Sequence, residues 1–129
     1  MEIASRIFAA LAGFLHIWIF IMESVLWLRP AIHRRFGVTD IKQAELMKNV
    51  FYNQGFYNLF LAIGVLYGVF FFNVHPGFAP PIMFYGCLCI VGAGLALLSS
   101  RRTMARAAII QALPPLISVI CFILFMRGM

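Results

Sequence analysis

The amino-acid sequence predicts an all-α fold, a polytopic membrane four-helix bundle with its N- and C-termini on the non-cytoplasmic side. Hydrophobic residues make up 64% of the 129 residues and charged residues only 11%, a composition that a soluble domain of this size could not cover with a polar surface. Apolar stretches lie at about 4–28, 50–72, 81–99 and 106–126. Each is about 20 residues or longer, which at about 1.5 Å per residue matches a hydrocarbon core of about 30 Å. These spans use up the chain, so we expect a single transmembrane domain, 1–129.

Local sequence signals support these boundaries. The first stretch is too long for the apolar region of a signal peptide and lacks a small-residue cleavage site before Arg29, so we expect it to stay in the chain. Pro30 disfavours helical geometry at Arg29, which predicts that the first helix ends there. Thr39 can cap a new helix with Asp40 in its first turn, and this helix is expected to run into the second stretch. Pro81 suits the first turn of the third helix.

Lys and Arg residues are distributed unevenly along the chain. The connection 73–80 has none, and only Arg6 and Arg127 lie near the two ends. The positive-inside rule therefore places the connections 29–48 and 101–106 in the cytoplasm and both termini outside. These connections should contact anionic lipid headgroups, and they hold no base-reading element that would indicate a nucleic-acid partner. Their basic residues are Arg29, Arg34, Arg35, Lys42, Lys48, Arg101, Arg102 and Arg106.

One acid, Glu23, lies within the first apolar stretch, about five residues from its cytoplasmic end. A carboxyl there must be shielded by other helices or stay protonated, and intramembrane acids usually mark functional sites. At about 100° per residue, His16, Glu23 and Trp27 share one helix face, with His16 about 10 Å from Glu23 along the axis. We assign Glu23 and His16 as candidate catalytic residues and Trp27 as a candidate ligand contact. The alternative for Trp27 is an aromatic belt residue at the membrane interface.

Polar side chains of the second and fourth stretches fall at a depth similar to that of Glu23. Gln54 and Asn58 share one face of the second helix, Asn53 and Tyr57 share a neighbouring face, and Gln111 lies about as deep in the fourth stretch. We predict a pocket in the inner leaflet, open to the cytoplasm and centred on Glu23. Alternatively, the Glu23 carboxyl and the amide side chains only hydrogen-bond to one another, so that they join the helices and bind no ligand. The candidate ligand-binding residues are Trp27, Asn53, Gln54, Tyr57, Asn58 and Gln111.

Glycine and proline residues in the spans have structural interpretations. Gly64 and Gly68 are one turn apart, a spacing typical of close helix packing. Pro114 and Pro115 remove helical hydrogen bonds, which predicts a kink near Leu113.

No metal and no cofactor are expected. Cys87 and Cys89 point to nearly opposite faces of one helix, and they and Cys121 are interpreted as buried apolar residues without a disulfide. A haem group would need a second intramembrane histidine, but His33 and His75 fall in connections.

Many of these residues occur together in motifs of a known family. The motifs are His16-x6-Glu23-x3-Trp27, Phe36-Gly37, the run from Asn53 to Gly64, and Gln111-Ala112-Leu113-Pro114. In these motifs, and over nearly its whole length, the chain resembles the DUF1304 proteins. The resemblance implies a small four-helix protein of bacteria, which we expect to be a multi-pass protein of the cytoplasmic (inner) membrane. It implies no particular activity.

Three classes of function fit these observations. The first, which we favour, is binding of an apolar or amphipathic small molecule or lipid, with Glu23 and the amides contacting its polar head. The second is a membrane enzyme that moves a proton on a lipid-like substrate, as an isomerase does, with Glu23 as general acid or base and His16 as its partner. The third is a proton-coupled transporter or a subunit of a membrane complex. The charge bias argues against an antiparallel dimer and leaves a parallel homodimer open.

Overall fold

Helices make up nearly the whole chain in a computed structural model that describes all 129 residues. The first segments are α1 (Glu2–Phe20), a π-helical turn (Ile21–Val25), α2 (Pro30–His33) and a 3-10 turn (Arg34–Phe36). They are followed by α3 (Ile41–Phe70), α4 (Ala79–Ser100), a second 3-10 turn (Arg102–Met104) and α5 (Ala105–Arg127). No strand is present, so the predicted all-α class is confirmed.

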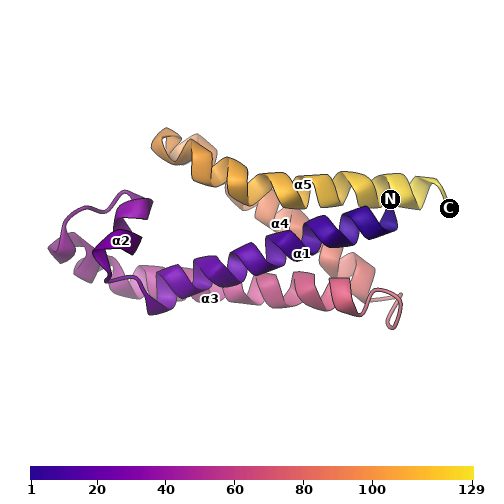
Figure 1. Ribbon diagram of the computed structural model, residues 1–129, viewed down its shortest axis with the longest axis horizontal. Helices are drawn as coiled ribbons and strands as arrows, with labels where there is room; N and C mark the ends of the chain where they lie inside the picture. Colours follow the sequence, from indigo (N-terminus) through magenta and orange to yellow (C-terminus); the bar gives the residue numbers. More distant parts are fainter.

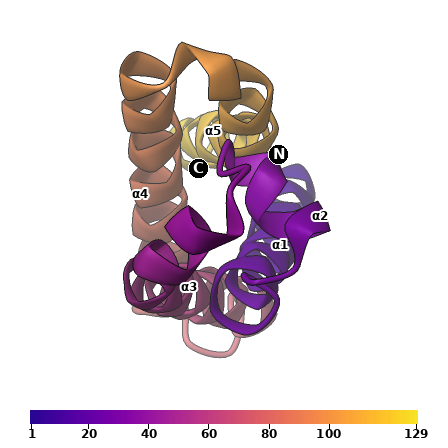
Figure 2. The same ribbon diagram turned by 90° about the vertical axis from the view of Figure 1, so that its left-hand side faces the viewer.

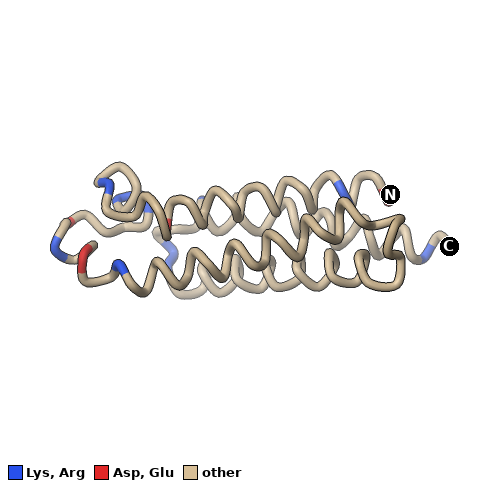
Figure 3. Tube along the Cα trace, turned by 90° about the horizontal axis from the view of Figure 1, so that it is seen from below, with Lys and Arg blue, Asp and Glu red and all other residues tan.

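The long helices α1, α3, α4 and α5 lie side by side (Figure 1). Both α1 and α4 pack against α3 and α5, so that the helices surround a shared core when seen end-on (Figure 2). The two termini and the α3–α4 connection lie at one end. The α2 segment and the α4–α5 connection lie at the other end, where most Lys and Arg residues gather (Figure 3).

Three helical segments are long and apolar enough to cross a membrane: Glu2–Val25, Ala79–Ser100 and Arg102–Arg127. The outer face of α1 is consistent with this environment, because it carries large apolar side chains three or four residues apart. They are Ile3, Ile7, Leu11, Phe14 and Trp18, each at least 42% exposed. Monomeric soluble proteins rarely expose such a continuous apolar strip.

The break after the first helix follows the prediction with one difference. Arg29 has extended backbone angles and Pro30 begins α2, as predicted. The first helix nevertheless ends earlier, at Val25 instead of near Leu28, because Leu26 leaves helical geometry.

The start of α3 is shifted by one residue from the prediction. Asp40, and not Thr39, is the capping residue, because its carboxylate accepts a hydrogen bond from the backbone N–H of Lys42 at 3.3 Å. From Ile41 the helix then runs without a break to Phe70, as expected.

Glycine brings α3 and α4 into close contact. A Cβ atom on Gly68 would lie 2.7 Å from both the Ala79 carbonyl oxygen and the Met83 backbone nitrogen. The same atom on Gly64 would meet only the Ile82 side chain, at 3.7 Å. Close packing is therefore confirmed for Gly68 and is absent at Gly64.

Two serines join α1 to α5 inside the core. The Ser5 hydroxyl donates to the Ser118 carbonyl at 3.0 Å, and the Ser118 hydroxyl donates to the Ser5 carbonyl at 2.8 Å. Both side chains are almost fully buried. Reciprocal bonds of this kind satisfy polar groups that would otherwise lie unpaired among apolar side chains. About one turn nearer the start of α5, the helix continues through Pro114 and Pro115, and its axis changes direction midway (Figure 1).

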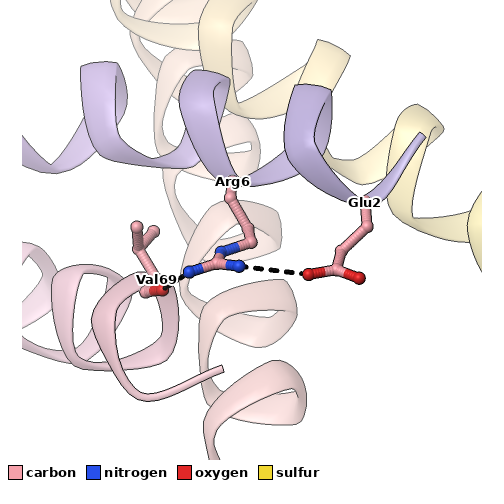
Figure 4. A network of polar contacts seen from close by, with 3 residues as sticks. All are labelled: Glu2, Arg6 and Val69. Carbon is pink, nitrogen blue, oxygen red and sulfur yellow. Dashed lines mark hydrogen bonds and ion pairs between the residues drawn. The ribbon is translucent and has the colours of Figure 1, made fainter. Parts of the chain in front are cut away.

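At the end of the protein that holds the termini, the Arg6 side chain binds a backbone carbonyl in the last turn of α3 (Figure 4). Its guanidinium pairs with Glu2 at 3.1 Å, donates to the Val69 carbonyl at 3.1 Å and lies over the Phe72 ring. The last carbonyls of a helix lack helical partners, and a basic side chain there is favourable. Arg6 therefore has a structural role.

Candidate functional site

Glu23 lies in the π-helical turn that ends the first helix. The backbone N–H of Leu26 bonds to the carbonyl of Ile21 at 2.9 Å, five residues back along the chain. An α-helix would make this bond over four residues, and π-helical turns are frequent at functional sites. The turn packs against α3 and buries Met22 and Glu23.

A glycine on α3 allows this turn to come close. A Cβ atom on Gly55 would overlap the Ser24 side chain and would lie 3.1 Å from the Ser24 backbone nitrogen. The Ser24 hydroxyl in turn donates to the backbone carbonyl of Tyr52 at 2.8 Å. The π-helical turn therefore packs directly against the α3 backbone at Gly55, and the Ser24 hydrogen bond joins the two segments.

Asn58 of α3 holds the Glu23 carboxyl. Its amide Nδ2 donates to Glu23 Oε2 at 2.8 Å and to the Gln54 backbone carbonyl at 3.2 Å. Glu23 is only 5% exposed and Asn58 only 8%. The other carboxyl oxygen, Oε1, has no hydrogen-bond partner in the protein and is not fully enclosed. That oxygen is available to a bound molecule.

A pocket of about 150 Å³ lies next to this carboxyl. Glu23, Ser24, Trp27, Lys48 and Tyr52 form its polar and aromatic wall, and Val25 and Leu28 complete it with apolar side chains. Its volume is several times the roughly 30 Å³ of a water molecule, enough for a small polar group. A second hollow, of about 160 Å³ between α4 and α5, is lined almost entirely by apolar residues.

The residues of this site fall inside a family match. A family described as "Protein of unknown function (DUF1304)" matches residues 10–123. The chain belongs to the DUF1304 family. The match extends over both Glu23 and Asn58 and confirms the resemblance seen in the sequence motifs. No curated protein and no solved structure matches the chain.

In this DUF1304 protein, Gln54 and Gln111 do not reach the Glu23 carboxyl. The Gln54 side chain is exposed, and only its backbone carbonyl takes part through Asn58. Gln111 is partly buried on α5 and its side chain makes no hydrogen bond, whereas the π-helical turn packs on α3. Of the predicted amides, only Asn58 contacts the acid.

Asn53 and Tyr57 lie on the outer surface of the protein. Asn53 is exposed, and Tyr57 is 66% exposed. The face of α3 that packs inward carries Gly55, Asn58 and Ala62, so the neighbouring face that holds Asn53 and Tyr57 turns away. Neither residue lines the pocket beside Glu23.

His16 is fully buried but is not bonded to Glu23. Its Nδ1 atom lies 2.8 Å from the Ala12 carbonyl, and its Nε2 atom is enclosed without a partner. A general acid or base and its partner need to come within hydrogen-bond reach. The predicted pairing of His16 with Glu23 is not present in this arrangement.

Trp27 contributes one edge to the pocket and is mainly a packing residue. Its ring stacks on Phe51 at 3.7 Å between centroids, and its indole N–H donates to the Ala44 carbonyl at 2.9 Å. With Val38 and Ala44 it forms a small apolar cluster beneath the α2 segment, which we call the cap cluster. Trp27 is only 2% exposed, so it is not a free aromatic at the membrane interface.

Several residues at this end were not singled out from the sequence. Lys48 and Tyr52 were not considered for the pocket, because a basic residue near a span end is explained by topology alone. His33 was expected in an open connection, but α2 folds inward and buries it, with its Nδ1 bonded to the Val38 carbonyl. Only a contact between distant segments could have revealed these positions.

Proposed function

We propose that this chain is a multi-pass protein of the bacterial inner membrane that binds an amphipathic small molecule or lipid beside Glu23. The pocket would accept the polar head, and the apolar part would extend along the neighbouring lipid-facing surface. Binding sites of this kind combine an apolar wall with a few well-placed polar groups.

The proposed topology has four spans, with α3 as the fourth and both termini outside. α3 is at least as long as the other three, and it packs between α1 and α4. Its hydropathy is lowered by Asn53, Gln54 and Asn58, which accounts for its absence from the three apolar spans. The concentration of basic residues at the α2 end supports a cytoplasmic location for that end (Figure 3).

The observation that carries the binding proposal is the incomplete hydrogen bonding of the Glu23 carboxyl. One oxygen is bonded to Asn58, the other has no protein partner, and the residue lines the pocket. Because the Glu23 side chain is only 5% exposed, a hydrogen bond from a bound donor would stabilise its carboxyl. If Glu23 served only to join helices by hydrogen bonds, both of its carboxyl oxygens would be expected to have protein partners.

The same geometry ranks the other candidate functions below binding. Isomerase-like proton transfer needs an acid–base partner for Glu23, and neither ring nitrogen of His16 is bonded to that carboxyl: Nδ1 lies against the Ala12 carbonyl and Nε2 has no partner. A proton-coupled transporter that works as an antiparallel pair conflicts with the uneven charge distribution.

The replacement Glu23→Gln tests the binding proposal. We expect the wild-type protein, purified in mild detergent, to retain an amphipathic molecule that mass spectrometry of the extract detects. Glu23→Gln keeps the side-chain size but weakens acceptance at the pocket, so the retained amount should fall about tenfold. Glu45→Gln is the matched control, because Glu45 is exposed on α3 and does not line the pocket. Equal retention by all three proteins would contradict the proposal.

A further inference from the structure

We propose that the molecule in this pocket is a monoacyl phospholipid, with its phosphate on Lys48 and its free glycerol hydroxyl on Glu23. The inference rests on the proposed function, because it names the class of molecule that the same pocket would take. It is carried by two charged groups that share one pocket at different depths.

Lys48 and Glu23 both line the pocket, but they are not paired with each other. The single ion pair of the structure joins Arg6 to Glu2 at the opposite end. The Lys48 side chain makes no hydrogen bond within the protein, and Glu23 Oε1 makes none either. The pocket thus offers one cationic donor and one acceptor, both free for a ligand.

The two groups stand in a fixed order along the helix axis. Glu23 is opposite Asn58, and Lys48 lies about ten residues nearer the start of α3, or about 15 Å at about 1.5 Å per residue. The start of α3 is at the end where the basic residues gather (Figure 3). Under the proposed topology, Lys48 is therefore at the level of the lipid headgroups, and Glu23 lies below it toward the hydrocarbon. The long Lys and Glu side chains shorten the gap between their charged ends.

A ligand that satisfies both groups needs an anion near the surface and a hydrogen-bond donor on its hydrocarbon side. A phosphate provides the anion, and Lys binds phosphate as a point charge. A monoacyl phospholipid has a free hydroxyl on its glycerol, one step below the phosphate. In a diacyl phospholipid this position is an ester without a donor. The amine of a zwitterionic headgroup lies on the water side of the phosphate, so it points away from Glu23.

The remaining wall of the pocket suits a single acyl chain. Val25 and Leu28 border the pocket and are 65% and 38% exposed. Under the proposed topology these side chains face lipid, so one chain could leave the pocket over them. A soluble phosphorylated alcohol would leave this apolar wall unfilled.

The test compares three probes for binding to the full-length protein in detergent micelles. The probes are a monoacyl glycerol phosphate, the same lipid with its free hydroxyl methylated, and glycerol phosphate without an acyl chain. We expect the first probe to bind, methylation to weaken its binding at least about tenfold, and glycerol phosphate to bind more weakly still. Lys48→Gln should weaken binding of the monoacyl lipid, whereas Lys42→Gln, an exposed lysine outside the pocket, should not.

The outcomes separate this inference from the proposed function. If the methylated lipid binds as well as the free-hydroxyl lipid to the wild type, and Glu23→Gln weakens both, the hydroxyl assignment is wrong and the binding function stands. If Lys48→Gln has no effect, the phosphate assignment is wrong. Tighter binding of glycerol phosphate than of the lipid would show a soluble ligand and overturn the inference. If no probe distinguishes the wild type from Glu23→Gln, and neither protein retains an amphipathic molecule, both proposals fail.

Discussion

Trp27→Ala is expected to lower the free energy of unfolding by about 3 to 5 kcal/mol, the usual cost of truncating a buried aromatic side chain. The Trp27 ring stacks on Phe51 and meets the edge of Phe36 at 5.5 Å between centroids. The change also removes the indole donor to the Ala44 carbonyl. Because these contacts hold the cap cluster together, the segment from Trp27 to Val38 should lose much of its contact with α3.

Trp18→Ala provides the control for this change. Trp18 is 42% exposed on the outer face of α1 and makes no hydrogen bond through its indole. Its removal should change stability by a small fraction of the effect at Trp27. Thermal or chemical unfolding in one detergent, followed by circular dichroism, would measure both variants. Equal losses would mean that Trp27 is not packed as described.

Gly68→Ala is expected to destabilise the protein by about 1 to 3 kcal/mol, the range for forcing extra volume into a packed interior. The added methyl group would meet the α4 backbone at Ala79 and Met83. Backbone cannot rotate away as a flexible side chain can, so α3 and α4 would have to separate along their contact.

Gly92→Ala is the matched control on α4. Gly92 is exposed, and a Cβ atom there would meet nothing within 4 Å. Alanine favours helix over glycine by about 0.5 to 1 kcal/mol, so this variant should be as stable as the wild type or slightly more stable. The same unfolding measurement compares the two variants. A Gly68→Ala protein that unfolds like Gly92→Ala would contradict the close α3–α4 contact at Gly68.

The positions of the long helices could be predicted from sequence because apolar length is a strong local signal. Arg29 and Pro30 marked a break that the structure contains. The inward face of α1 and the π-helical turn was also predicted, since His16 and Glu23 fall at helical spacing and both are buried. These features depend only on residues close together in the chain.

The candidate site was predicted less completely, because its details depend on how helices turn toward one another. Gln54, Asn58 and Gln111 are all amides at a similar depth, but only Asn58 points at Glu23. Periodicity places Gln54 and Asn58 on one face, and the close approach at Gly55 decides which of them is covered. The π-helical turn has no sequence signature in this chain, and the cap cluster depends on a contact between Trp27 and Phe51, which lie far apart in the chain.

Photo-crosslinking with a phospholipid that carries a reactive group near its glycerol tests the central claim most directly. Peptides from the cross-linked wild type and from Glu23→Gln would be mapped by mass spectrometry. We predict labelling of residues 21–28 and 48–52 in the wild type, with loss of that labelling in Glu23→Gln. Labelling that concentrates instead on the α4–α5 hollow, around Leu95 and Leu113, and is the same in both proteins would contradict a binding site at Glu23.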